Sequence, residues 1–194
     1  RDAKCNVFVL ESDKAQISQK FHDIKRIKPN IIFTVGTTPT VEILRLFADI
    51  PVIATLILDE AMIMQARNAT GVILSFPIET QFYLLKNFLP EGRKIGVMYN
   101  PSENQEKIRS AKTIARKMGL DIYPVEVDSP KDIPNALKVL ANSVDILWGI
   151  NDALVFNSLT AKQILLFSFR NHIPFIGLSS TWAKAGALYA LEYD

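Results

Sequence analysis

The sequence has only one cysteine and two histidines among its 194 residues. Cys5 therefore lacks an intrachain disulfide partner, and neither a zinc cluster nor a two-thiol redox site can be assembled from it. A cofactor-independent amino-acid racemase of the two-thiol type is excluded for the same reason. The neighbours Ala3, Lys4 and Asn6 are not the small apolar residues that lead into a lipid-modified cysteine, which argues against a lipid anchor at this position.

The sequence also lacks an excess of charge of one sign and a long hydrophobic run. Its 22 Lys and Arg residues are nearly matched by 20 Asp and Glu residues, and without a basic stripe nucleic-acid binding is disfavoured. No run reaches the roughly 18 apolar residues of a membrane span. The chain begins with the charged pair Arg1 and Asp2 and not with a cleavable signal, as expected of a protein without a signal or of a mature or truncated form.

Motifs of the common cofactor enzymes are missing as well. There is no G-x-G-x-x-G, no Walker loop, no G-x-S-x-G elbow and no H-E-x-x-H. We expect His22 and His172 at the surface or at element boundaries and not as catalytic bases. The sequence thus favours a protein without cofactor, metal or catalytic activity. An enzyme that uses Asp59 or Asp152 as a base stays open as an alternative.

What the sequence does contain is an alternation of short apolar runs with longer amphipathic segments. Several of the runs are apolar at consecutive positions, which is typical of parallel strands buried on both faces. The predicted strands are residues 6–10, 31–35, 52–57, 71–74, 94–99, 122–127, 144–148, 174–177 and 187–191.

The segments between these strands have helical periodicity. Apolar residues recur at intervals of three and four in 17–27, 108–118 and 133–140. Thr38-Pro39 and Ser129-Pro130 each offer an N-cap followed by proline, and Ser102 with Gln105 has the spacing of a capping box. A left-handed helix stop is expected at Gly119, because this residue directly follows the last apolar position.

Repeated strand-helix alternation predicts an α/β protein with one or two doubly wound parallel sheets. The strands are too many for one open sheet in a chain of this length, so we expect two lobes, at residues 1–76 and 77–194. Ligands of such sheets lie beyond the carboxyl ends of the strands, where this sequence is rich in small polar groups. Helix starts near Thr38 and Ser102 suit a carboxylate or phosphate, or the two side chains simply cap their helices.

Acidic and aromatic residues also follow the predicted strands. Asp59 and Asp152 either pair with a ligand ammonium group or cap the next helix. Tyr99 and Trp148 either enclose an apolar ligand group or pack in the core. For Phe76 and Trp182, which occupy similar positions, core packing is the favoured interpretation.

Five segments, in their order along the chain, resemble the ABC-transporter substrate-binding proteins of the tryptophan/aromatic-amino-acid type. They are KPNIIFTVGT (28–37), DIPVI (49–53), NATGV (68–72), RKIGVMYNP (93–101) and AGAL (185–188). The resemblance implies the type I periplasmic binding protein fold, in which two α/β lobes joined by a hinge, here near Phe76-Pro77, close on a small molecule. It also implies further segments before Arg1 and after Asp194, so that the first lobe would be incomplete.

The resemblance implies an inter-lobe cleft lined by the same strand-end segments. Two places depart from the family's pattern: Ala153 follows Asp152 where Asp-Asn is frequent, and Asp59-Glu60 replaces an Asp-Pro. Together with the strand-end analysis, the candidate ligand-binding residues are Thr37, Thr38, Asp59, Tyr99, Asn100, Ser102, Asn104, Trp148, Asn151, Asp152, Ser179 and Ser180.

The function implied is that of a periplasmic or extracytoplasmic component of an ABC importer, which captures a zwitterionic ligand such as an amino acid by lobe closure and delivers it to a membrane permease. Helix-start amides with Thr37, Thr38 and Ser102 would hold the carboxylate, and Asp152 would hold the ammonium group. The alternative is the ligand-sensing domain of a signalling protein with the same fold.

Overall fold

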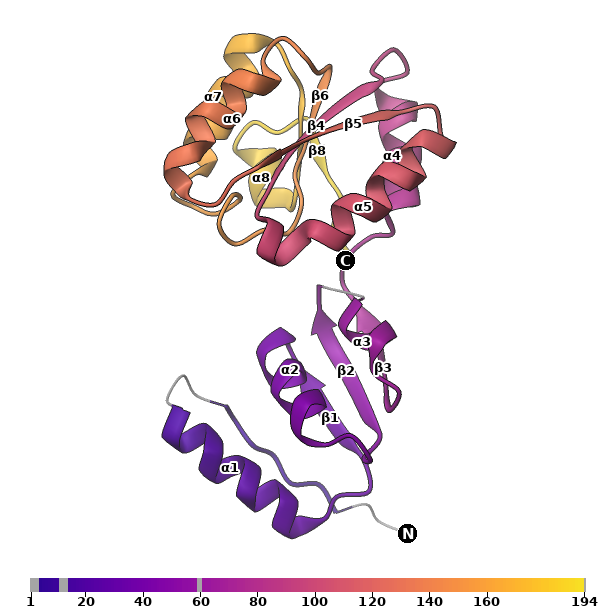
Figure 1. Ribbon diagram of the computed structural model, residues 1–194, viewed down its shortest axis with the longest axis vertical. Coiled ribbons are helices and arrows are strands. Elements are labelled where there is room, and N and C mark those ends of the chain that lie inside the picture. Colours follow the sequence, from indigo (N-terminus) through magenta and orange to yellow (C-terminus); the bar gives the residue numbers. More distant parts are fainter. Residues whose placement is uncertain (1–3, 11–13, 59–60, 194) are drawn as a thin grey trace. The chain divides into compact units, whose positions relative to one another are not determined.

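The computed structural model describes residues 4–10, 14–58 and 61–193, and the chain divides into two compact units (Figure 1). Unit 1 is Arg1–Ser75 and unit 2 is Phe76–Asp194. Each unit is a sheet of parallel strands connected by helices. The predicted α/β class with parallel sheets is therefore confirmed.

Unit 1 has a three-stranded sheet in the order β1-β2-β3, with all pairs parallel. Sequential strands are neighbours, so the chain crosses the sheet in one direction. The elements are α1 (Lys14–Ile27), β1 (Ile32–Val35), α2 (Thr37–Leu46), β2 (Val52–Ile57), α3 (Ala61–Gln65) and β3 (Ala69–Ile73).

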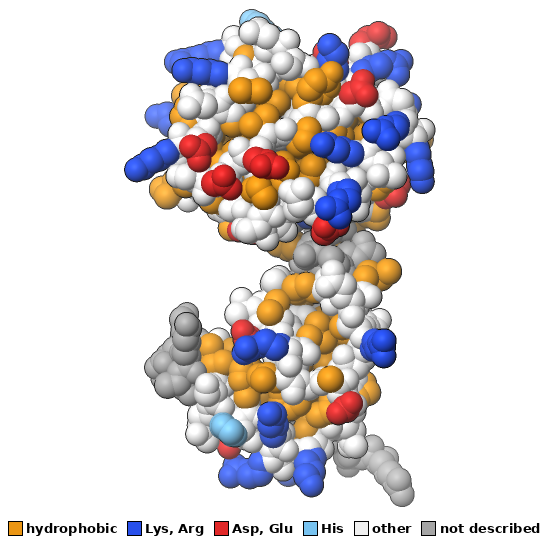
Figure 2. All heavy atoms as spheres, in the orientation of Figure 1, with side chains coloured by type: hydrophobic (Ala, Val, Ile, Leu, Met, Phe, Trp, Pro, Cys, Tyr) orange, Lys and Arg blue, Asp and Glu red, His pale blue; other side chains and the backbone are white. Residues whose placement is uncertain are grey.

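The core of unit 1 lies on one face of this sheet. Phe21 and Ile24 of α1 pack with Ile43 of α2, with Phe47 and with Val52 of β2. The side chains that alternate with this face point the other way. Phe33, Val35 and Val72 are 65%, 62% and 62% exposed, and Figure 2 shows hydrophobic side chains at the surface of this unit. Unit 1 thus leaves part of its apolar surface in solvent.

Unit 2 has a five-stranded parallel sheet in the order β5-β4-β6-β7-β8. Its elements are α4 (Ile78–Phe88), β4 (Lys94–Tyr99), α5 (Pro101–Lys117), β5 (Asp121–Glu126), a 3-10 turn (Pro130–Asp132), α6 (Ile133–Leu140), β6 (Ile146–Trp148), α7 (Ala161–Asn171), β7 (Phe175–Gly177), α8 (Ser180–Lys184) and β8 (Tyr189–Ala190).

The core of unit 2 includes residues from both sides of its central strands. All residues of β4 except Lys94 are buried, as are all residues of β6 and β7. Phe82 of α4 is fully buried and meets the Trp148 ring edge-on at 5.0 Å between centroids. The helices in Figure 1 accordingly flank this sheet. These strands are therefore buried on both faces, as their runs of consecutive apolar residues predicted.

Three local predictions are wrong. Residues 6–10 form no strand, because a strand needs a hydrogen-bonded neighbour and no described residue provides one. Thr38 is not a cap, since α2 begins at Thr37 behind Gly36, whose φ of 93° favours glycine. Ser102 lies inside α5, whose cap is Asn100.

Other local predictions are confirmed. Ser129 accepts a hydrogen bond from the Lys131 amide at the start of the 3-10 turn before α6. Gly119 has a left-handed φ of 73° directly after Met118, the C-cap of α5. His22 and His172 are both exposed, as expected of surface residues.

Candidate ligand-binding site

The sheet of unit 2 reverses its strand order at β4. The next strand in the chain, β5, lies on one side of β4, whereas β6 lies on the other. The connections that leave β4 and β6 therefore run in opposite directions, and in open α/β sheets ligands bind at the carboxyl ends of strands at such a reversal. Asn100 follows β4, and Asn151 and Asp152 come shortly after β6. This edge of unit 2 is the first part of the candidate site.

Asp152 joins the two loops at this edge. Its side chain is 4% exposed. Oδ2 accepts from the Asn100 backbone N at 2.6 Å and from Asn104 Nδ2 at 2.9 Å. Oδ1 accepts from the backbone N of Leu154 and of Val155, at 3.2 and 3.0 Å. Four donors occupy the acceptor positions of the carboxylate, so Asp152 caps a turn and fixes the β4 loop to the β6 loop in this structure.

The start of α5 is closed by its own loop. The side chain of Asn100 accepts from the backbone N and from Oγ of Ser102, at 2.9 and 2.6 Å. The backbone amides of Glu103 and Asn104 donate to the carbonyl of Asn100, and Pro101 has no amide hydrogen. All amides of the first turn are therefore engaged within the loop, and the α5 start offers no free donor to an anion.

Asn104 and Asn151 complete the same network. Asn104 is buried, and its Nδ2 donates to the Asn151 carbonyl at 3.1 Å as well as to Asp152. Asn151 itself is exposed. Glu103, which is not among the residues expected from the sequence, accepts from the Ala153 amide at 3.1 Å. Its position in the first turn of the helix that follows β4 is the sequence feature that could have identified it as part of this network.

Tyr99 and Trp148 are core residues of unit 2. The Trp148 indole Nε1 donates to Gln81 Oε1 at 2.8 Å. The Tyr99 hydroxyl lies 2.9 Å from Glu126 Oε1 and 3.1 Å from Gln105 Oε1, and its single hydrogen is shared between these two acceptors. Burial, with the Glu126 carboxylate beside the hydroxyl, raises the pKa of Tyr99 to about 12. Both side chains are 3% exposed or less, so this structure favours core packing over contact with a ligand.

Ser179 and Ser180 lie at the start of the short helix α8. Ser179 is its N-cap without a side-chain cap bond, and the Ser180 amide donates to Glu192 Oε2 at 3.0 Å. Hydrogen bonds from Ser180 hold the pKa of the Glu192 carboxyl below its usual value. Trp182 packs against Phe175, which confirms its interpretation as a core residue.

In unit 1 the carboxyl edge of the sheet presents the start of α2. Thr37 and Thr38 are exposed, and among the described residues neither backbone amide has a hydrogen-bond partner. The α2 N-cap is Gly36, which has no side chain to supply a cap. Behind this turn, buried Thr40 Oγ1 donates to the Gly36 carbonyl at 2.7 Å and lies 2.8 Å from Thr34 Oγ1. Asp59 lies outside the described residues.

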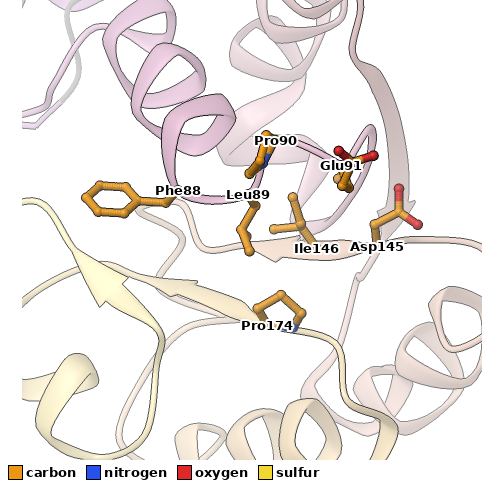
Figure 3. Close-up of a pocket in the computed structure, with 8 residues that line it drawn as sticks. Phe88, Leu89, Pro90, Glu91, Asp145, Ile146 and Pro174 are labelled. Carbon is orange, nitrogen blue, oxygen red and sulfur yellow. The ribbon is translucent and has the colours of Figure 1, made fainter.

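A hollow of about 360 Å³ lies at the opposite, amino-terminal edge of the unit 2 sheet (Figure 3). Asp145 at its rim accepts from the backbone N of Arg93 and of Lys94, both at 2.9 Å, and these bonds hold the pKa of its carboxyl below the usual value. The Asp145 carboxylate therefore accepts hydrogen bonds from the protein's own backbone. The lining residues are Phe88, Leu89, Pro90, Glu91, Gly92, Asp145, Ile146 and Pro174.

No group of His, Cys, Asp and Glu side chains within residues 4–10, 14–58 and 61–193 is arranged to hold a metal ion. Among the helices described, none is both long and apolar enough to span a membrane.

Two α/β units with parallel sheets, each with polar loops at the carboxyl edge of its sheet, define the class of type I periplasmic binding proteins. The family model of ABC transporter substrate binding proteins matches residues 4–194, and the chain belongs to this family. The family resemblance found in the sequence is thus confirmed.

Individual relatives agree with this family. A tyrosine-binding protein of Clostridioides difficile (strain R20291) is 26% identical over 176 residues, which are 86% of this chain and 50% of that protein. The chain therefore spans about half the length of this curated relative. The crystal structure of an ABC domain in complex with L-Trp from Streptococcus pneumonia superposes with a TM-score of 0.66 at 20% identity, over 95% of this chain and 65% of that one.

A further solved structure supports the fold. A conserved domain protein from Vibrio cholerae (o1 biovar eltor str. n16961) superposes with a TM-score of 0.67 at 21% identity, over 94% of this chain and 64% of that chain. At these identities the structural matches establish the arrangement of strands and helices.

Proposed function

We propose that this protein is the extracytoplasmic solute-binding component of an ABC importer, and that it captures an amino acid by closure of two lobes and delivers it to a membrane permease. Membership of the substrate-binding family over residues 4–194 carries the proposal. The names of two relatives, one binding tyrosine and one in complex with L-Trp, support an amino acid as the ligand and an aromatic one as the first to test. The protein acts without catalysis.

The two helix starts at the candidate site differ in what they can offer a carboxylate. The first-turn amides of α5 are engaged by Asn100, whereas those of Thr37 and Thr38 at α2 are free among the described residues. Free amides and the positive end of the helix dipole favour an anion. We therefore assign the ligand carboxylate to the start of α2 and not to Ser102.

The ammonium group requires a different partner from the one the sequence suggested. Four donors already occupy the Asp152 carboxylate, so an ammonium group would have to displace one of them. We assign Asp152 the role of a positioning residue, which holds the two loops of unit 2 in the geometry that the ligand meets.

A calorimetric titration with the common amino acids tests the function. We expect one or more of them to bind with a Kd below about 1 mM, and the amide derivative of the same amino acid, which lacks the carboxylate, to bind at least about tenfold more weakly. If no amino acid binds at this concentration, the proposed ligand class is wrong.

A matched pair of variants tests the assignment of the carboxylate. Thr38→Asp and Ser102→Asp each place a carboxylate on the second residue of a helix, at an exposed position where helix dipoles tolerate it. We expect Thr38→Asp to weaken amino-acid binding about tenfold through repulsion, and Ser102→Asp to weaken it much less. Equal losses in both variants would contradict the assignment to α2.

A further inference from the structure

Leu56 has an unusual backbone conformation near the carboxyl end of β2. Its φ is +54°, in the left-handed region that leucine rarely adopts. The left-handed conformation costs a residue with a Cβ about 1–2 kcal/mol. Leu56 is the one residue with positive φ within any described strand.

The cause is a β-bulge. The pairing of β2 with β3 shifts its register between Ala54 and Ile57. Val52 and Ala54 face the core, and regular alternation would place Leu56 there next. Instead Ile57 takes the buried position at 0% exposure, and the Leu56 side chain is 54% exposed. The extra residue of the bulge thus places the Leu56 side chain in solvent, whereas regular alternation would have placed it in the core.

The bulge is held from both sides, so it is not the fraying of a strand end. The Gly36 amide donates to the carbonyl of Thr55 at 2.8 Å, just before Leu56. The Leu74 amide donates to the carbonyl of Ile57 at 2.8 Å, just after it. In Figure 1 this is the arrowhead end of β2. Hydrogen bonds from both neighbouring segments therefore fix the position of the strained residue.

The bulge also lies beside the start of α2. Val35 pairs with Thr55 and Gly36 bonds the same residue, so the turn into Thr37 and Thr38 runs next to Leu56. Neighbouring strands are about 4.8 Å apart. Leu56 therefore lies one strand away from the turn that presents the α2 amides, to which the proposed function assigns the ligand carboxylate. The side chain of an amino acid begins one carbon from its carboxylate.

Backbone strain of this kind concentrates at functional sites, where bulges re-aim side chains. We propose that Leu56 is a specificity-determining residue, whose exposed side chain packs against the apolar side chain of the amino-acid ligand. This role depends on the proposed function. It makes the affinity for large apolar amino acids, and not for glycine or alanine, dependent on the size of residue 56.

The experiment measures the affinities of the wild type, Leu56→Ala and Leu56→Gly for L-tryptophan, L-tyrosine, L-leucine, L-valine, L-alanine and glycine by calorimetry. For the best-bound large ligand we expect a loss of about tenfold in both variants, because a buried apolar contact is removed. The ratio of its affinity to that for alanine falls by the same factor. Leu166→Ala, which shortens a 41% exposed leucine of α7, is the control and leaves the ratio unchanged.

Thermal unfolding separates binding from folding. Glycine adopts φ near +54° without strain, so Leu56→Gly is expected to unfold at a temperature no lower than wild type while it binds more weakly. If Leu56→Ala and Leu56→Gly keep the wild-type affinity ratios within twofold, the role of Leu56 is overturned and the proposed function stands. If the wild type itself binds none of the six amino acids, the proposed function fails and this role fails with it.

Discussion

The two units use the same strand-helix construction but bury their sheets to different extents. In unit 2 the central strands β4, β6 and β7 are buried at nearly every position. In unit 1, β1 and β3 alternate between covered and exposed residues, and Phe33 and Val35 lie in solvent. A parallel sheet becomes fully buried only when helices cover both of its faces. In the described part of unit 1, helices cover only one face of the sheet.

This difference implies a difference in stability. Apolar burial contributes about 25 cal/mol per Å², and unit 2 has by far the larger core cluster. Unit 2 should therefore unfold independently and at higher denaturant concentration than unit 1. The chain also supplies a selective reporter, since both tryptophans and all five tyrosines lie in unit 2. Tryptophan fluorescence follows unit 2 alone, whereas far-UV circular dichroism follows both units.

The largest expected effect comes from a matched pair of phenylalanines. Phe82→Ala removes a fully buried ring in unit 2 and its contact with Trp148, and should cost about 3–5 kcal/mol. Phe33→Ala removes a ring that is 65% exposed in unit 1 and should change the stability by less than about 0.5 kcal/mol. Urea unfolding followed by fluorescence and circular dichroism measures both. Similar losses in the two variants would mean that the outer face of unit 1 is covered.

The sequence predicted the strands best where local pattern and tertiary burial agree. The predicted strands 52–57 and 94–99 match β2 and β4, because each of these apolar runs lies in a sheet and pairs with neighbouring strands. Residues 6–10 have an equally good apolar pattern but no pairing partner among the described residues. An apolar pattern indicates that a segment can form a strand. Whether the strand forms depends on a hydrogen-bonded neighbour, which the rest of the fold must supply.

The site was predicted less completely, for a related reason. The rule that ligands lie at strand ends selected the loops after β4 and β6 as a candidate site, and the structure brings their Asn100, Asn104 and Asp152 together. Sequence could not show that Asp152 has four donors inside the protein. Nor could it show that Leu56 is turned outward, because a bulge depends on the register of two neighbouring strands.

The second expected effect tests the loop network of unit 2. Asp152→Ala removes the buried acceptor of the Val155 backbone N and one of the two acceptors of the Asn104 amide group, which should cost about 3 kcal/mol. Fluorescence-detected unfolding measures the loss in unit 2. Asp128→Ala, at an exposed aspartate of the same unit, is the control and should be nearly neutral. An unchanged midpoint for Asp152→Ala would show that the loops hold together without the carboxylate.

The third expected effect concerns the turn into α2 in unit 1. Thr40→Val keeps the shape of the side chain but removes its hydrogen bonds to Gly36 and Thr34, with a cost of about 1–2 kcal/mol. Circular dichroism should show a lower midpoint for the unit 1 transition, while the fluorescence transition of unit 2 stays in place. Thr113→Val on the exposed surface of α5 is the control. A shift of the fluorescence transition would contradict independent unfolding of the two units.

The smallest expected effect is the response of unit 2 to alkaline pH. Burial and Glu126 raise the pKa of Tyr99 from 10.0 to about 12, and burial alone raises that of Tyr189 to about 12. A native pKa above the unfolded value means that the native state holds the proton more tightly. The stabilisation is therefore complete below about pH 10 and is lost as the pH rises towards 12.

Urea midpoints of the tryptophan transition at several pH values between 9 and 12 test this response. The Tyr99→Phe variant has no hydroxyl to ionise beside Glu126, so its midpoint should fall less steeply over this range than that of the wild type. Tyr189→Phe should reduce the slope as well, since the Tyr189 hydroxyl is buried and has no hydrogen-bond partner among the described residues. Because unit 1 has no tyrosine, its own transition should show no such component. Parallel pH profiles for the wild type and both variants would show that neither hydroxyl contributes to the stability of unit 2.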